Sequence, residues 1–552
     1  MFEIINLFFV QNYMNVNHQK LLTDVELETK ILPNINNTIT IFGKQYMRTI
    51  FNTIKNSTEI IEHELEIKKF INNKSIKKVI HHLKQIKKNQ TYVNEILNDN
   101  NNIENKDQEL SHDYKDLIFK KELFNQQSLL SISNFIKIYS PSFVIIIYLV
   151  IYLFYRYIGI NLNIKEYLYS IYTQWQSAVE LILHLISSYE HFNSFLANIV
   201  VTSYLAFQLY TMASSFNNSY QHYNKCAILK KNVNKINMII YESDKIINLC
   251  KFSNKSQCII PIIQQLKNLF DPHKINNLGY CILKRKDITN YLELFNKLFE
   301  YIGYIDTMIV IENLLKNKYT IPIFDFQSDR PYVKSTNIWN PQYKGFQISN
   351  DCNLGENNQN NMILTGPNTS GKSTYIRGIL IALLMAHTLG ITCCDKLELT
   401  NFTHLCSYID IPNISRYKES LFEAELARCN KLCNILETIP KNEFVFTVMD
   451  ELFTGTNPTE GTAGSYGVAK YLGEFDNVLM IITTHFIKLT ELGKYNDNFI
   501  NKKFVIYRYN NEFIKDYKIV DGISDQCVAI ELLAQKGYNE KIIKYANEHM
   551  LT

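Results

Sequence analysis

The segment that most constrains the fold of this chain is bracketed by two glycines. Residues 366–373 read G-x-x-x-x-G-K-S, and glycines at these positions let the backbone turn so that consecutive N–H groups point at one anion. A short apolar run at residues 361–364 comes before this segment, and an apolar run of helical character at residues 375–385 follows it. Because a helix N-terminus adds partial positive charge, the order strand, loop, helix predicts a phosphate-binding loop.

The predicted loop also supplies side chains for a nucleotide and a metal ion. Lys372 is placed to reach the β- and γ-phosphates, and Ser373 offers a hydroxyl to Mg²⁺. We therefore expect ATP and Mg²⁺ as the cofactors. The expected nucleotide-binding residues are Gly366, Pro367, Asn368, Thr369, Ser370, Gly371, Lys372, Ser373 and Thr374.

Two later apolar runs end in side chains that suit hydrolysis. Residues 444–449 form an apolar, β-branched run that predicts a buried strand, and Asp450 and Glu451 follow it. One carboxylate can hold the Mg²⁺ shell, and the other can orient or deprotonate the attacking water. Residues 479–485 predict another strand, which ends in His485. Each piece alone also fits a surface turn or a structural histidine, but in this order after a phosphate loop they indicate an ATPase.

Several strings of the C-terminal half resemble one family. "TGPNTSGKSTYIRGIL", "ESLFEAEL", "MDELFTGTNPTEG" and "ITTHF" are similar to the ATPase domain of the MutS DNA mismatch-repair family, which is related to the ABC class. The resemblance covers roughly residues 300–550. It has two departures, which are typical of divergent members. The family usually has Gly-Arg where this chain has Phe453-Thr454, and Met-Gly where it has Thr369-Ser370.

The resemblance implies a fold and a set of catalytic roles. It predicts an α/β P-loop ATPase domain of ABC-like type, preceded by a mainly α-helical N-terminal region. Lys372 would stabilise phosphate charge, Glu451 would act as the base, and His485 would sense the γ-phosphate and the water. The expected metal ligands are Ser373 and Asp450.

The resemblance also implies a shared active site. Ser420, in the family's signature segment, would donate to the γ-phosphate of the partner protomer, so hydrolysis would need a homodimer or heterodimer through the ATPase domain. Read without the family, Ser420 is a helix N-cap with Glu423 three residues later, which is a capping box. Both interpretations can hold together.

Composition divides the chain into four expected domains. Residues 1–130 are helical and basic, with a polar linker near residues 98–107, and residues 131–218 are hydrophobic and helical. Residues 219–335 alternate apolar and polar positions at helical spacing, which suits a core or lever-like region of long helices. Residues 336–552 form the expected ATPase domain.

The N-terminal region carries a dense group of lysines. The net charge of the whole chain is only +4, but eight lysines fall between Lys68 and Lys88. A basic helix can follow the phosphates of double-stranded DNA or the headgroups of an anionic membrane. A solvated helix face explains the same pattern, so all three interpretations stay open.

Two long uncharged segments raise the question of a membrane. Residues 138–155 and 192–224 contain no Asp, Glu, Lys or Arg, and a bilayer span needs about 20 apolar residues. Polar side chains such as Gln208 weaken the second segment. The alternatives are a membrane hairpin and a buried helical hairpin within a soluble region.

The sequence favours an ATP-driven clamp or switch that acts on DNA in repair or recombination. Phe-x-Glu, the wedge with which mismatch-binding members stack on DNA, does not occur before Trp339, so we expect no intrinsic mismatch recognition. Eleven cysteines without a C-x-x-C pair predict no zinc site and a reducing intracellular compartment, nucleus or cytoplasm. The alternative is a membrane-anchored ATPase of the same family that acts on a protein or lipid partner.

Overall fold

The computed structural model describes most of the chain. The described residues are 17–90, 127–186, 194–251, 253–345, 348–409, 421–509, 512–524, 530, 533–534 and 536–550. The expected linker near residues 98–107 and the signature serine Ser420 lie outside these ranges.

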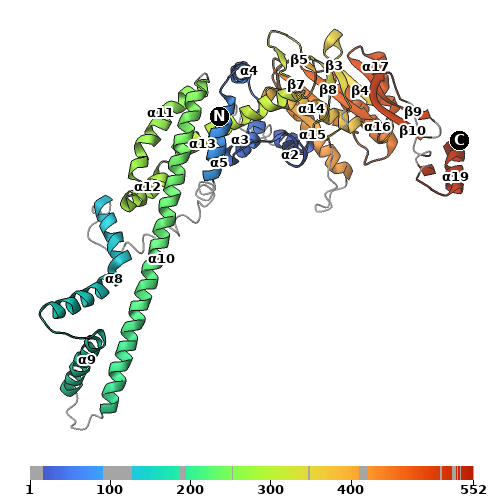
Figure 1. Ribbon diagram of the computed structural model, residues 1–552. Helices are drawn as coiled ribbons and strands as arrows, with labels where there is room; N and C mark the ends of the chain where they lie inside the picture. The colour runs from blue at the N-terminus through green and yellow to red at the C-terminus, as the bar shows by residue number, and fades with distance from the viewer. Residues whose placement is uncertain are drawn as a thin grey trace, which may run out of the picture. The chain divides into compact units, whose positions relative to one another are not determined.

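The chain forms two compact units that do not follow its order. One unit combines Met1–Lys84, Asn248–Gln257 and Phe299–Thr552, and the other combines Gln85–Ile247 with Cys258–Leu298. N-terminal helices therefore belong to the same unit as the expected ATPase domain (Figure 1), a grouping that the composition did not predict. The boundaries drawn at residues 130, 218 and 335 stay predictions.

The second unit is helical. Its longest helix is α10 (Ser194–Leu249), which extends for about 84 Å at 1.5 Å per residue. The other helices are α8 (Gln127–Tyr157), α9 (Ile164–Ile186), α11 (Asn254–Leu269) and α12 (Leu278–Asn290). α8 packs against α12, and its Pro141 lies near a bend of 48° between residues 127–143 and 145–157.

The uncharged segments fall on two of these helices. Residues 138–155 lie within α8, and residues 194–224 lie within α10. Over the described ranges, no single helix is long and apolar enough to cross a bilayer. The two arms of α8 pass that test only together, by length and composition, across their bend.

The first unit begins with short helices that confirm the helical prediction for residues 17–90. They are η1 (Leu27–Ile31), α2 (Leu32–Ile35), α3 (Ile41–Thr49), η2 (Ile50–Asn52), α4 (Ser57–Ile71) and α5 (Ile76–Asn89). Asn56 and Glu59 form a capping box at the start of α4. Within the region expected at residues 219–335, α13 (Leu292–Lys316) is followed by the strand β1 (Ile323–Asp325).

The C-terminal part of this unit contains a six-stranded sheet in the order β10-β9-β4-β8-β7-β6. Its strands are β4 (Asn361–Thr365), β6 (Phe402–Tyr408), β7 (Phe444–Asp450), β8 (Val478–Thr484), β9 (Phe499–Tyr509) and β10 (Glu512–Asp521). All neighbours are parallel except the antiparallel pair β9–β10. A second sheet has the order β1-β5-β2-β3, with β2 (Val333–Ile338), β3 (Asn350–Leu354) and β5 (Lys396–Thr400).

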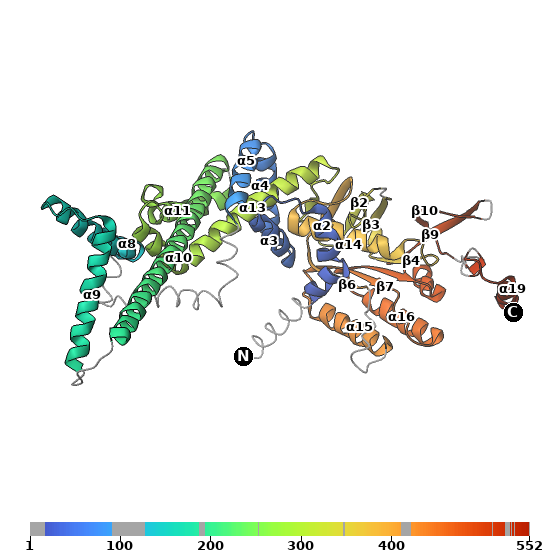
Figure 2. The ribbon, with the colours of Figure 1, turned by 60° about the horizontal axis from the view of Figure 1, so that its bottom comes forward.

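Helices cover both faces of the six-stranded sheet, as the α/β prediction requires. Figure 2 shows α14 (Lys372–Leu389) on one face and α15 (Leu421–Thr438) and α16 (Pro458–Leu472) on the other. Every residue of β4 and β8 is buried, which explains why these strands read as continuous apolar runs. The shorter α17 (Leu492–Tyr495) and α19 (Glu540–Met550) follow in the chain.

The N-terminal helices close the far end of α14. The backbone N–H of Lys55 donates to the carbonyl of His387 (3.3 Å), and its ammonium donates to that of Thr388. His63 Nε2 lies 3.0 Å from the carbonyl oxygen of Leu389. The backbone and side chain of Lys55 and the side chain of His63 therefore bind carbonyls that a helix C-terminus leaves without partners inside the helix.

Candidate nucleotide-binding site

The predicted phosphate loop lies between β4 and α14, as the sequence indicated. Gly371 precedes the first residue of α14 with φ +105°, and a Cβ added there would lie 3.1 Å from Cδ1 of Tyr517. Glycine is therefore required at this position both by conformation and by space. Thr369, where the family usually has methionine, adopts a left-handed φ of +65°.

Lys372 lies at the centre of this loop. Its side chain is only 5% exposed, and its Nζ donates to the carbonyl oxygens of Gly366 (2.9 Å) and Pro367 (3.4 Å). Burial lowers the pKa of Lys372, and the neighbouring carboxylates of Glu451 and Asp450 partly offset that effect. A buried ammonium inside a loop of backbone amides suits a phosphate group.

Glu451 and His485 meet Lys372 from two neighbouring strands. Glu451 Oε1 lies 2.7 Å from His485 Nε2 and 3.5 Å from Lys372 Nζ. His485 Nε2 also lies 3.1 Å from Lys372 Nζ, so this nitrogen either donates to the carboxylate or accepts from the ammonium. The hydrogen bond with His485 is the main cause that lowers the pKa of Glu451. The geometry thus joins three of the predicted catalytic residues.

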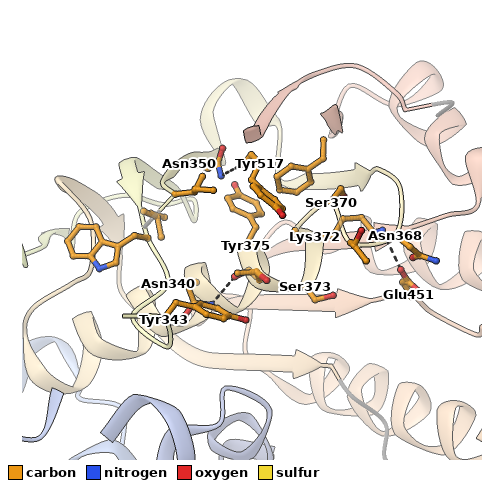
Figure 3. Close-up of a pocket in the computed structure, with 18 residues that line it drawn as sticks. Asn340, Tyr343, Asn350, Asn368, Ser370, Lys372, Ser373, Tyr375, Glu451 and Tyr517 are labelled. Carbon is orange, nitrogen blue, oxygen red and sulfur yellow. Dashed lines mark hydrogen bonds and ion pairs between the residues drawn. The ribbon is translucent and has the colours of Figure 1, made fainter. Parts of the chain in front are cut away.

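The topology of the sheet explains this convergence. β8 lies between β4 and β7, and the carboxyl ends of adjacent parallel strands meet at one edge. Glu451 leaves β7 with a left-handed φ of +49°, and its N–H donates to the carbonyl of Thr483 (3.1 Å) on β8. This turn directs the side chain toward the loop that follows β4, where Figure 3 shows it facing Lys372.

The two expected metal ligands lie in the same region. Asp450 is the last residue of β7, and its Oδ1 accepts a hydrogen bond from the Thr483 hydroxyl. Ser373 lines the pocket in the first turn of α14. One carboxylate and one hydroxyl fit Mg²⁺, which keeps several waters and takes substrate phosphates. Within the described ranges no cluster of three or more His, Cys, Asp or Glu side chains forms a closed metal site.

A cavity of about 470 Å³ extends from the phosphate loop to two aromatic walls. Asn340 and Tyr343 lie together on one side of it and Tyr517 lies on another (Figure 3), and Phe504 also lines it. A volume of this order is typical of a small-molecule site with an apolar part and a few polar groups.

Sequence reasoning missed these wall residues because no local motif marks them. Tyr517 lies in β10 at an irregularity of the β9–β10 pairing, with φ +54°. Its carbonyl accepts from Nδ2 of Asn350 (2.9 Å), and nearby Lys515 Nζ donates to the Thr369 hydroxyl (2.6 Å). Tyr517 could have been found as an aromatic residue at an irregular position of β10. That irregularity is visible only once the β9–β10 pairing is known.

One buried polar atom in the loop is suited to a ligand. Ser370 is almost completely buried, and its Oγ has no hydrogen-bond partner among the parts of the chain that are described. A buried hydroxyl normally finds a partner. Its position in the loop fits a phosphate oxygen as that partner.

The signature segment is described only from Leu421, where α15 begins. Glu425 on α15 is buried and accepts from the Thr454 hydroxyl and from the N–H of Gly455, both at 3.2 Å. Phe453, where the family usually has glycine, is buried at a left-handed φ of +55° and packs edge-on against Phe422. A phenylalanine at this φ is strained by about 1–3 kcal/mol, and its burial offsets part of that cost.

A mostly parallel sheet that has helices on both faces, and a glycine loop at the carboxyl end of a central strand, defines an α/β domain. The C-terminal part of the chain carries a domain of the MutS family. Residues 362–552 match the family model described as MutS domain V.

Curated relatives agree with this assignment. DNA mismatch repair protein MutS of Pseudothermotoga lettingae is 28% identical over 262 residues, which are 47% of this chain and 32% of that protein. The MutS of Lactobacillus johnsonii is 24% identical over 60% of this chain and 39% of its own length. DNA mismatch repair protein MSH2 of Saccharomyces cerevisiae is 29% identical over 36% of this chain and 21% of its own length. The matched part of the chain thus spans between 21% and 39% of the length of these relatives.

Proposed function

We propose that this protein binds ATP with Mg²⁺ at residues 366–374 and hydrolyses it to drive a DNA clamp or switch. The supporting observation is the convergence of Lys372, Glu451 and His485 at the carboxyl edge of the sheet, next to a pocket large enough for a nucleotide. Proteins of the MutS family are in general ATPases, which favours this chemistry.

In the proposed reaction each residue has one role. Lys372 leaves its carbonyl contacts and balances charge on the β- and γ-phosphates, while Ser370 Oγ donates to a phosphate oxygen. Ser373 and Asp450 would hold Mg²⁺, which would supply positive charge next to the phosphates. Glu451 is ionised at neutral pH, as glutamates ordinarily are, and it accepts a proton from the attacking water. His485 holds that carboxylate in place.

The aromatic walls are suited to the base of the nucleotide. Tyr343 and Tyr517 line the part of the cavity beyond the loop, and aromatic rings bind a planar base by stacking. Asn340 adds a polar side chain there, which can contribute hydrogen bonds to the ligand.

The partners of the reaction are inferred from the family. The curated relatives are named DNA mismatch repair proteins, so we propose double-stranded DNA as the macromolecular substrate, in mismatch-repair-like or recombination reactions. We also propose a homodimer or heterodimer in which Ser420 contacts the partner's γ-phosphate. Mismatch recognition is not included in this proposal.

The test of the nucleotide site is a pair of lysine variants. Lys372→Ala removes the buried ammonium of the loop, and we expect ATP affinity to fall by about tenfold or more, the loss of one strong charge-assisted contact. Lys488→Ala removes an exposed lysine three residues after His485 and should leave affinity unchanged. ATP binding by equilibrium titration and phosphate release are measured for both. Equal affinities in wild type and Lys372→Ala would exclude this site.

A further inference from the structure

One short N-terminal segment reaches two sides of the nucleotide site. Residues 24–34, named here the N-terminal link, include a left-handed residue at Glu26 (φ +53°) and the π-helix η1. Short π-helical segments are rare and often occur at functional positions. The link and all its contacts below lie within the first compact unit.

The C-terminal end of the N-terminal link, at Asn34, and the backbone carbonyl of Val25 hold the wall of the pocket. Gln342 is buried, and its Nε2 donates to the carbonyl of Val25 (2.7 Å). Asn34 Nδ2 donates to the carbonyls of Pro341 (2.9 Å) and Gln342 (3.0 Å). The position of this wall therefore depends on a segment more than 300 residues earlier in the chain.

Gln342 also forms hydrogen bonds with Asn340, which lines the cavity. Its backbone N–H donates to Asn340 Oδ1 (2.9 Å), and its Oε1 accepts from Asn340 Nδ2 (3.2 Å). Asn340 Nδ2 also donates to the carbonyl of Thr374 (3.1 Å), which belongs to the first turn of α14. The network thus runs from the link to the helix that begins at the phosphate loop.

The other end of the N-terminal link holds α15. Asp24 forms an ion pair with Arg428, and the two side chains are 5% and 9% exposed. The Ser407 hydroxyl donates to Asp24 Oδ2 (2.8 Å), and Arg428 also donates to the carbonyl of Ile409 (2.7 Å). A buried pair with its remaining hydrogen bonds satisfied has a well-defined geometry.

α15 in turn contacts the segment that follows the proposed base. Glu425, one turn before Arg428, accepts from Thr454 and Gly455, which follow Glu451 by three and four residues. The link, α15 and the segment after Glu451 are therefore joined through Asp24, Arg428 and Glu425, whose side chains are at most 9% exposed.

We propose that the N-terminal link is a positioning element that couples the nucleotide pocket to α15. Asn34 and Gln342 position the wall that receives the nucleotide, and Asp24 positions the helix whose start carries the signature segment. The assignment rests on the proposed ATPase function, since it names residues that adjust that same site. It predicts that the two ends of the link affect different constants, namely affinity at the pocket end and turnover at the α15 end.

The pocket end is tested with Asn34→Ala. Loss of its two hydrogen bonds should raise the Kd of ATP by about fivefold, the effect of roughly one net hydrogen bond. The matched control is Asn401→Ala, because Asn401 Nδ2 also joins the ATPase domain to an N-terminal helix, through the Ser57 hydroxyl (3.1 Å), away from the pocket. The control should change Kd by less than twofold while losing similar thermal stability.

The α15 end is tested with Asp24→Leu combined with Arg428→Met. Replacing both partners by apolar residues avoids an unpaired buried charge, and such replacements often leave a protein folded and stable. We expect the Kd of ATP to stay within twofold and kcat to fall by about fivefold or more. Combining these changes with Asn34→Ala gives a double-mutant cycle, and coupling requires effects on kcat/KM that are not additive.

The outcomes separate the two proposals. If wild-type protein binds no ATP, the proposed function fails before the link is tested. The proposal also fails if wild type binds ATP but Asn34→Ala and Asn401→Ala bind it with the same Kd. It fails likewise if the Asp24/Arg428 variant keeps the kcat of wild type. In either case the N-terminal link only stabilises the fold. Asn34→Gln, which keeps the amide, should recover part of the affinity, and a failure to do so in a folded variant also contradicts positioning.

Discussion

Replacing Glu451 by glutamine should separate ATP binding from hydrolysis. The glutamine keeps the size of the side chain and can still accept a hydrogen bond from His485, which lies 2.7 Å away. It cannot take a proton from water. Loss of a general base costs about 10²- to 10⁴-fold in rate, or about 3–5 kcal/mol of transition-state stabilisation.

The same change should cost little in stability or in affinity. Glu451 is about one-third exposed, so its ion pairs contribute at most about 1 kcal/mol to folding. Lys372 loses a carboxylate 3.5 Å away, which leaves its charge free for phosphate. We therefore expect ATP to bind with equal or higher affinity, while Asp450 keeps the metal ligand on β7.

The assay combines single-turnover hydrolysis with light scattering. Glu451→Gln should bind ATP, hydrolyse it at least a hundredfold more slowly, and accumulate as an ATP-bound dimer. The control is Glu474→Gln, an exposed carboxylate between α16 and β8 at the opposite edge of the sheet. A Glu451→Gln protein that turns over within threefold of wild type, or that stays monomeric with ATP, would refute the assignment of the base.

Three further predictions address the partner site, the basic helix and a buried lysine. Mixing Lys372→Ala with Ser420→Ala should restore about a quarter of wild-type turnover, because half of the dimers are mixed and each rebuilds one site of two; no recovery at concentrations that give dimers would exclude a shared site. Lys77, Lys84 and Lys88 lie on the exposed side of α5, and replacing them by Gln should reduce the slope of log K for DNA against log salt concentration by about 2.7. The control replaces the exposed Lys441, Lys470 and Lys488 by Gln. If both triple variants keep the wild-type slope, α5 is only a solvated helix face. Burial lowers the pKa of Lys55 to about 7, so the unfolded chain binds more protons above that pH and stability should rise from about pH 7 towards pH 10. The free energy of unfolding of wild type should rise over this pH range by at most about 5 kcal/mol more than that of Lys55→Met. Chemical denaturation at several pH values measures both proteins, and identical pH profiles would contradict the prediction.

The sequence predicted those parts of the site that local patterns determine. The loop at residues 366–373 lies between the expected strand and helix, and β7 and β8 end next to Glu451 and His485 as their apolar runs indicated. Each of these assignments uses a single stretch of neighbouring residues, of which residues 361–385 are the longest. Parallel pairing then brings the loops together without further information.

The remaining parts of the site depend on contacts between distant residues. Tyr517 lines the cavity only because the β9–β10 pairing is irregular, and Gln342 is held by a residue 317 positions earlier. Phe453 occupies a left-handed position that its residue type disfavours, so propensity argued against the observed backbone. The expected linker at residues 98–107 and the role of Ser420 stay predictions.

The closure of α14 by Lys55 and His63 has a practical consequence for expressing parts of this protein. A fragment cut at residue 336 would keep the sheet but expose the carbonyls at the end of α14, together with the apolar surface that the N-terminal helices cover. Water would solvate the exposed carbonyls, but each lost hydrogen bond from Lys55 or His63 still removes about 0.5–1.5 kcal/mol, which is a noticeable fraction of the stability of a domain. A fragment that keeps these contacts therefore combines the three pieces of the first compact unit, Met1–Lys84, Asn248–Gln257 and Phe299–Thr552, joined by short linkers in place of the second unit.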